Sequence, residues 1–89
     1  MHEMTLLKDV VQKIMQVAEV NEAVAVTEVR LQLGALAHIS ADHLREHFEQ
    51  AVAGSLIEGA ALIIEELTDA EHPEAQEIVL RDVQVAVAS

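Results

Sequence analysis

The sequence contains no cysteine, tryptophan or tyrosine, and Phe48 is its only aromatic residue. Without cysteine, the chain cannot form a disulfide framework, a zinc knuckle, an iron–sulfur cluster or a thiol nucleophile. Glycine is also scarce, with only three residues, and no nucleophile elbow, Walker loop or glycine-rich dinucleotide turn occurs. Because the usual signatures of cofactor-dependent enzymes are absent, we expect a protein that is not an enzyme.

Basic residues are few, since 5 Lys and Arg stand against 16 Asp and Glu and the formal net charge is −11. Such a charge repels phosphate backbones and anionic lipids, which argues against nucleic acid and membrane partners. The longest stretch without Asp, Glu, Lys or Arg runs only from Leu31 to Ala41, far short of the roughly 20 residues that cross a bilayer. The chain also opens without the basic and then apolar run of a signal peptide. We therefore expect a soluble, cytoplasmic protein.

Apolar residues make up 52% of the 89 residues, enough for the core of one small domain. Between residues 6 and 19 they recur with the period of a helix, and the helical wheel separates completely into an apolar and a polar half. The apolar half comprises Leu6, Leu7, Val10, Val11, Ile14, Met15, Val17 and Ala18. This pattern predicts an amphipathic helix that lies on a sheet or on another helix.

A period of two replaces the helical period after Val26, which predicts a strand with one buried face that ends at Gly34. The buried face is formed by Val29, Leu31 and Leu33. Val24 and Val26 have the opposite parity, so the strand either begins after them or contains a bulge near Thr27.

A second helix is expected after Ser40 or Asp42, because either side chain can serve as its N-cap. Its apolar stripe comprises Ala41, Leu44, Phe48, Ala51 and Val52, and residues 53–55 close the helix. A short apolar strand over residues 60–64, an acidic loop over residues 67–76 and a last strand over residues 78–87 follow. In the last strand one parity holds Val79, Val83, Val85 and Val87.

The element order α-β-α-β-β predicts a two-layer α/β (α+β) fold, in which two helices pack on one face of a small three-stranded mixed sheet. The strand, helix, strand segment should form a right-handed crossover with a parallel pair. The loop over residues 67–76 is short enough for an antiparallel hairpin between the last two strands. Such a sheet has two edges, and a homodimer would protect one of them.

The first residues are a candidate metal site. The α-amine of Met1 and the ring of His2 are two kinds of nitrogen donor, and the backbone amides between them can supply more. Nitrogen-rich, near-planar coordination favours Ni(II) or Cu(II). The affinity should fall on acidification, because amine and imidazole have unperturbed pKa values of about 7.7 and about 6.5.

Two other clusters bear on chemistry. His43, Glu46 and His47 match the pattern of an inverted zinc-protease motif, although an enzyme of this kind needs a third ligand and a substrate cleft. The alternative is a pair of histidines at the boundary of the apolar stripe. The second cluster is acidic and comprises Glu65, Glu66, Asp69, Glu71, Glu74 and Glu77, with His72 among them. It lacks the ordered alternation of a calcium loop, so a solvated loop is the simpler interpretation.

Several segments together resemble the HypA/HybF family of nickel-delivery proteins for hydrogenase and urease maturation. The start, Met1-His2-Glu3-Met4-Thr5-Leu6, is similar to the family's opening of Met-His-Glu, an aliphatic residue, Ser or Thr, and Leu. Val26 to Gly34 resembles its first strand. Further similarities, in its second helix and strand, are Leu44, Phe48-Glu49, Gly54-Ser55, Glu58-Gly59-Ala60 and Leu62. The resemblance covers residues 1–66 and extends to the last strand.

The resemblance implies a nickel metallochaperone whose Ni(II) is held by Met1, His2 and Glu3. It also implies a HypB-like GTPase and the hydrogenase large subunit as partners. Residues 1–89 would form one nickel-binding domain, and residues 67–76 stand where the family inserts a zinc domain with two Cys-x-x-Cys pairs. Without those cysteines, no zinc is expected. The alternative is a protein-interaction adaptor that kept the fold but lost metal delivery.

Overall fold

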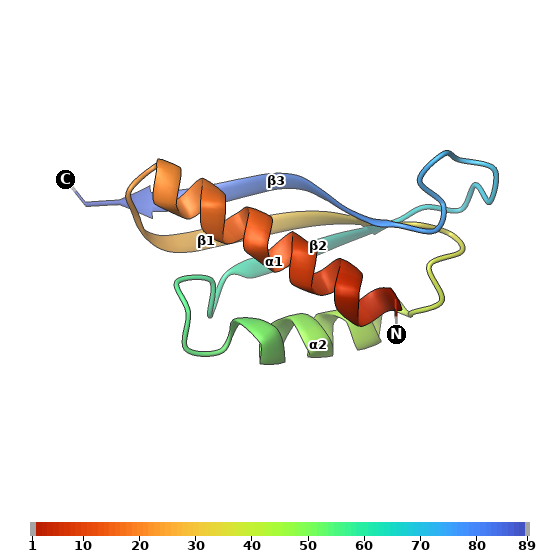
Figure 1. Cartoon of the computed structure of the whole chain (residues 1–89), viewed down its shortest axis with the longest axis horizontal. Helices are drawn as coiled ribbons and strands as arrows, with labels where there is room; N and C mark the ends of the chain where they lie inside the picture. The colour runs from red at the N-terminus through yellow and green to blue at the C-terminus, as the bar shows by residue number, and fades with distance from the viewer. Residues whose placement is uncertain (1, 89) are drawn as a thin grey trace.

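The computed structural model describes the backbone of residues 2–88 and the side chains of residues 5–88. Its elements are α1 (His2–Val20), β1 (Ala23–Leu33), α2 (Ala41–Val52), β2 (Ala61–Glu66) and β3 (Ile78–Val87). Both helices lie on one face of the three-stranded sheet, and α1 runs across the sheet beside α2 (Figure 1). The predicted fold class and element order are thus confirmed.

The sheet has the strand order β2-β1-β3, with β1 parallel to β2 and antiparallel to β3. The mixed sheet was predicted correctly, but the predicted hairpin between the last two strands is wrong, because β3 pairs with β1. The chain after β2 crosses the end of β1, where Leu67 N donates to Leu33 O (2.9 Å) and Gly34 N donates to Glu77 O (2.9 Å). The central position gives β1 a partner on both edges, and its Val29 and Leu31 are fully buried.

A bulge in β1 explains why Val26 lies on the buried face, while a further register shift lies between Ala23 and Ala25 and Val24 is exposed. The pairing with β3 shifts register between Val26 and Glu28, so Thr27 is the extra residue. The Thr27 hydroxyl donates to Gln84 O (3.2 Å), and both Val26 and Val29 are buried. The strand therefore begins before Val26 and contains the bulge near Thr27. Of the two possibilities that the sequence left open, a later start of the strand is wrong.

A second bulge, in β3, overturns the predicted face of that strand. The partners of β1 pass from Asp82 to Leu80, which makes Arg81 the extra residue. As a result, the residues of β3 that face the helices are Ile78, Leu80, Val83 and Val85. Val79 lies on the opposite face from Val83, and Val87 is 57% exposed. Strict alternation from the sequence could not show an inserted residue.

The core lies between the sheet and the two helices. Its buried residues are Leu7, Val10, Ile14 and Ala18 of α1, Leu44, Phe48 and Val52 of α2, Val26, Val29, Leu31 and Leu33 of β1, together with Ala37, Ile57, Leu62 and Ile78. Ala51 is exposed, contrary to its predicted place on the buried stripe. Ile57, in the turn after α2, is fully buried although the helical pattern did not include it.

Ser40 is the N-cap of α2, and its hydroxyl accepts a hydrogen bond from His43 N (3.1 Å). We expect Ser40→Ala to lower the free energy of unfolding by about 1 kcal/mol, since an amide of the first turn loses its acceptor. Urea denaturation followed by circular dichroism measures the change. Ser40→Asp keeps an acceptor and should stay near the parent stability, whereas an equal loss in both variants would contradict the capping role.

Candidate metal site

The predicted nickel ligands lie at the start of α1. Met1 lies outside the described residues, as do the side chains of His2 and Glu3, while the backbone of the last two residues belongs to the first turn of α1. That turn lies at the same end of the molecule as the start of α2 (Figure 1). The first four N–H groups of a helix have no acceptor within the helix. The amides of His2 and Glu3 are therefore not committed to hydrogen bonds of α1.

The three residues of the inverted zinc-protease motif do not form a metal site. His43 and His47 lie one turn apart on α2, with their ring centroids 5.7 Å apart. Among the residues that the structure describes, no group of three His, Asp or Glu side chains is placed to hold a metal ion. His43 is exposed and His47 half-buried, which agrees with the interpretation as boundary histidines.

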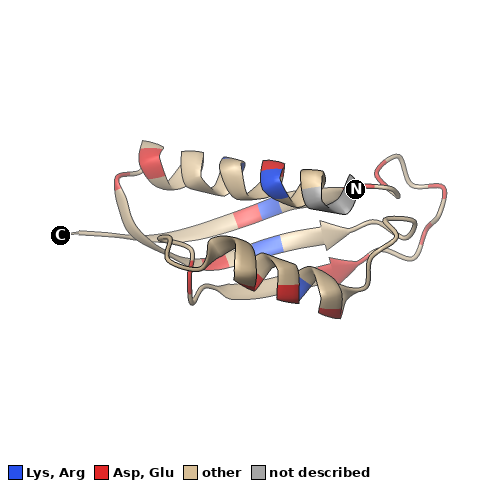
Figure 2. Ribbon diagram, turned by 60° about the horizontal axis from the view of Figure 1, so that its bottom comes forward, with Lys and Arg blue, Asp and Glu red and all other residues tan. Residues whose placement is uncertain are grey.

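The acidic segment after β2 is a loop, as its composition predicted. Two of its side chains hold its turns, since Asp69 Oδ1 accepts from Glu71 N (2.9 Å) and His72 Nδ1 accepts from Glu74 N (3.0 Å). Acidic residues also mark the outer side of α2 and the end of β2 (Figure 2). The loop carboxylates are thus spread over the surface of the turn and do not converge on one point.

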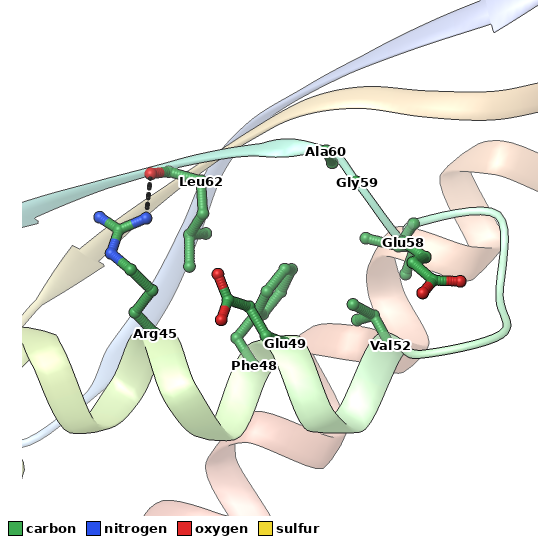
Figure 3. Close-up of a pocket in the computed structure, with 9 residues that line it drawn as sticks. Arg45, Phe48, Glu49, Val52, Glu58, Gly59, Ala60 and Leu62 are labelled. Carbon is green, nitrogen blue, oxygen red and sulfur yellow. Dashed lines mark hydrogen bonds between the residues drawn. The ribbon is translucent and has the colours of Figure 1, made fainter.

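A groove between α2 and β2 is the feature that sequence reasoning missed (Figure 3). It has a volume of about 420 Å³ and is lined by Arg45, Phe48, Glu49, Val52, Ile57, Glu58, Gly59, Ala60 and Leu62. Arg45 Nη1 donates to Leu62 O (2.8 Å), and Glu58 Oε1 accepts from Gly54 N (3.0 Å). Two of the three charged side chains of the groove, Arg45 and Glu58, therefore bind backbone groups and organise the local fold. The sequence did not predict the contact of Arg45 with Leu62, because it joins α2 to β2, whereas Glu58 and Gly54 lie within the turn between these elements.

The groove holds no catalytic arrangement, since its polar groups include no nucleophile paired with a base. Over residues 2–88, no helix is both long and apolar enough to cross a membrane. What distinguishes the chain is a two-layer α/β domain whose helix α1 begins with a candidate metal-binding sequence.

Solved structures share this architecture. A solution structure described as the Ni metallochaperone HypA from Helicobacter pylori superposes with a TM-score of 0.78 at 15% identity, covering 97% of this chain and 98% of that one. A second, described as the solution structure of HypA protein, gives a TM-score of 0.73 at 17% identity, covering 99% and 98%. At these identities the likeness shows the fold alone: this chain shares the two-layer fold of both structures.

The sequence comparisons identify the family. The family described as hydrogenase/urease nickel incorporation, metallochaperone, hypA matches residues 1–72. The hydrogenase maturation factor HypA of Streptomyces avermitilis is 43% identical over 68 residues, which cover 75% of this chain and 52% of that protein. The factor of Methanobrevibacter smithii is 34% identical over 67 residues, covering 75% and 54%. The chain belongs to the HypA family.

The family is one of metallochaperones and not of enzymes, which agrees with the expectation from the missing catalytic motifs. This chain spans about half the length of the curated relatives it matches. The relatives' names describe hydrogenase maturation factors, and the family description adds nickel incorporation into hydrogenase and urease.

Proposed function

We propose that this chain is a nickel-binding metallochaperone for the maturation of a nickel enzyme, a [NiFe] hydrogenase, and that it binds Ni(II) as cargo through Met1, His2 and Glu3. One observation carries the proposal: the family match begins at residue 1 and so includes these three residues. The ligand set has the right chemistry, since an amine, an imidazole and deprotonated amides favour Ni(II).

The position of the site on the fold supports this ligand set. The helix begins at His2, so the amides of His2 and Glu3 can lose their protons to a metal without breaking a hydrogen bond of α1. The net charge of −11 attracts a divalent cation over the whole surface. The start of α1 therefore has backbone amides that are free to bind a metal ion, and the negative charge of the protein attracts such a cation.

The remaining features of the proposal follow the family. A HypB-like GTPase and the hydrogenase large subunit are the proposed partners, in the cytoplasm, and residues 1–89 act as one nickel-binding domain without zinc. Residues 67–76 are the proposed place of the zinc domain in longer relatives. The hydrogen bonds of Leu67 and Glu77 to the end of β1 support this place. They hold both ends of the loop against the sheet, although β2 and β3 lie on opposite sides of β1.

The metal site is tested by titrating Ni(II) into the untagged chain in a calorimeter, beside a variant with one residue placed before Met1. The extension removes the amine from its position next to His2, so we expect nickel affinity to be lost or strongly reduced. We expect His2→Ala to weaken binding by more than about 1.4 kcal/mol, a factor of about ten. His43→Ala is the matched control, because His43 is an exposed histidine of α2.

Equal affinity in the extended and native chains would refute the N-terminal site. Failure of both His2→Ala and the extension to change affinity, together with partner capture that survives a chelator, would favour the adaptor function instead. Loss of binding in His43→Ala would move the site to α2. Each result thus selects one of the alternatives raised by the sequence.

A further inference from the structure

The two edges of the sheet differ in how they are covered. The edge strand β2 is short, and Arg45 of α2 binds the carbonyl oxygen of its Leu62. Its last residues, Glu65 and Glu66, are acidic, which discourages pairing with another strand. The edge strand β3 has ten residues, and within residues 2–88 it pairs only with β1. The unguarded edge is therefore that of β3.

The surface beside β3 is suited to a neighbour. A groove of about 430 Å³ runs between α1 and β3 and is lined by Lys13, Gln16, Val17, Val20, Asn21 and Leu80. Val20 is 83% exposed, and Lys13 is the only charged residue of the groove. Within β3 Arg81 and Asp82 carry opposite charges, and Arg81 also pairs with Glu74 of the preceding loop (2.8 Å). In a chain of net charge −11, this is a region where a second acidic molecule meets little repulsion.

Because of the bulge, the order in which the side chains of β3 alternate between the two faces of the sheet is the same from either end of the strand. Ile78, Leu80, Val83 and Val85 face the helices. The other residues face the open side of the sheet, because Val79 pairs with Gln32, Asp82 with Arg30 and Gln84 with Glu28 of β1. Arg81 also lies there, since its guanidinium binds Gln32 Oε1 (2.7 Å). The pattern is symmetric about the bond between Arg81 and Asp82.

From this symmetry we propose that β3 pairs antiparallel with β3 of a second copy of this chain, which joins two sheets into one of six strands. With the two-fold axis between Arg81 and Asp82, Leu80 lies opposite Val83 of the second copy, and Ile78 lies opposite Val85. Every residue then meets a residue of its own face. In a strand without a bulge, neighbouring residues face opposite sides of the sheet, so the two-fold axis must pass through a residue. The bulge puts Arg81 and Asp82 on the same face, which allows the axis to pass between them.

Charge complementarity selects a second copy over an unrelated strand. In this register Arg81 lies opposite Asp82 of the second copy, and the symmetry forms the same pair twice. Opposite charges across antiparallel strands are favourable, and like charges are unfavourable. The apolar residue opposite Leu80 would also extend into the groove beside α1. The edge of β3 therefore fits the same edge of a second copy in three ways: residues on the same face lie opposite each other, opposite charges pair, and the groove beside α1 accepts an apolar side chain.

The test is sedimentation of the 89-residue chain from about 1 μM to about 1 mM, the range over which moderate association becomes visible. We expect a concentration-dependent dimer. R81D and D82R each place like charges across the axis twice, and each should raise the dimer dissociation constant by about fivefold to tenfold. The double variant R81D/D82R restores opposite charges and should return to within about twofold of the parent.

Lys8→Asp is the matched control, since it makes the same charge change as R81D at an exposed residue of α1 that does not line the β3 groove. It should leave the dissociation constant unchanged. Thermal melting of each variant separates loss of the dimer from loss of the fold, because Arg81 also binds Glu74 (2.8 Å). A parent chain that remains monomeric, or a double variant no tighter than the single ones, would overturn the proposal.

A distance measurement is independent of the charge variants. The chain has no cysteine, so Glu28→Cys on the central strand accepts a single spin label without touching the edge. Glu28 pairs with Gln84 and Gln32 with Val79, so in this register the two labels are three strand spacings and four residues of β1 apart, which places them at a distance of roughly 20 Å. A dimer with labels beyond about 40 Å, by the same spacing rules, pairs through another surface and contradicts the β3 interface.

Discussion

Phe48→Ala is expected to lower the free energy of unfolding by about 3–5 kcal/mol, the largest loss of any single substitution argued for this chain. Phe48 is the only aromatic residue, and it is 2% exposed between α2 and the sheet. Truncation removes its buried ring surface and leaves a cavity that the surrounding helix and strands can only partly close. Small domains have total stabilities of about 5–15 kcal/mol, so the variant would be marginally folded.

Urea and thermal denaturation followed by circular dichroism measure this loss, and the melting temperature should fall by about 15–30 °C. Phe48→Leu is the matched control, because it keeps most of the apolar volume and should cost clearly less. Ala51→Ser on the same helix tests the corrected face of α2, since Ala51 is exposed and should tolerate the change. A loss below about 1.5 kcal/mol in Phe48→Ala would contradict the position of Phe48 in the core.

Gly34→Ala is expected to have the second largest effect, about 2–3 kcal/mol, because no space exists for a methyl group. A Cβ atom at Gly34 would overlap the backbone of Glu74 and Ala75, which cannot rotate away as a side chain can. Gly34 N also donates to Glu77 O (2.9 Å), so the glycine joins the end of β1 to the loop before β3. The substitution must displace that loop or strain the end of β1.

The matched control for this steric effect is Gly59→Ala. Gly59 has φ +86°, and a Cβ atom there would meet nothing within 4 Å. Its substitution costs about 1 kcal/mol through the left-handed backbone alone. Hydrogen exchange separates the two, since only Gly34→Ala should release the amide of Leu36 from Ala75 O (2.7 Å). If Gly34→Ala and Gly59→Ala lower the free energy of unfolding equally, and the amide of Leu36 does not exchange faster, then contact between a Cβ atom at Gly34 and the backbone of Ala75 is not the cause of the loss.

Local patterns in the sequence were sufficient for most elements. The apolar period over residues 6–19 predicted α1, and two possible caps, Ser40 and Asp42, indicated where α2 begins, of which the structure selects Ser40. The change of parity around Thr27 predicted either a later start of β1 or a bulge, and the register shows the bulge. Each of these signals depends on residues a few positions apart, and such spacing is fixed by the geometry of a single helix or strand.

The two candidate metal sites differ in how far the sequence alone could identify them. The residue types at the N-terminus suggested a site for Ni(II) or Cu(II), the family resemblance pointed to nickel, and the proposal still rests on that sequence and on the family match. The motif of His43, Glu46 and His47 looked similar in kind, yet the fold supplies no third ligand among the described residues. A ligand set drawn from several elements depends on the tertiary structure, whereas a terminal amine and its neighbouring residue are adjacent by covalent connection.

The sequence by itself determined the element order, the apolar stripe of α1 and the absence of thiol chemistry, and it limited the cap of α2 to Ser40 or Asp42. Only the tertiary structure decided that β3 pairs with β1, that Arg81 is a bulge and that Arg45 binds the edge of β2. The reason is physical: a period of two shows which residues of a strand share a face but not which strand lies beside it. The choice of neighbour depends on how the loop crosses the end of β1 and how both edges of that buried strand are covered.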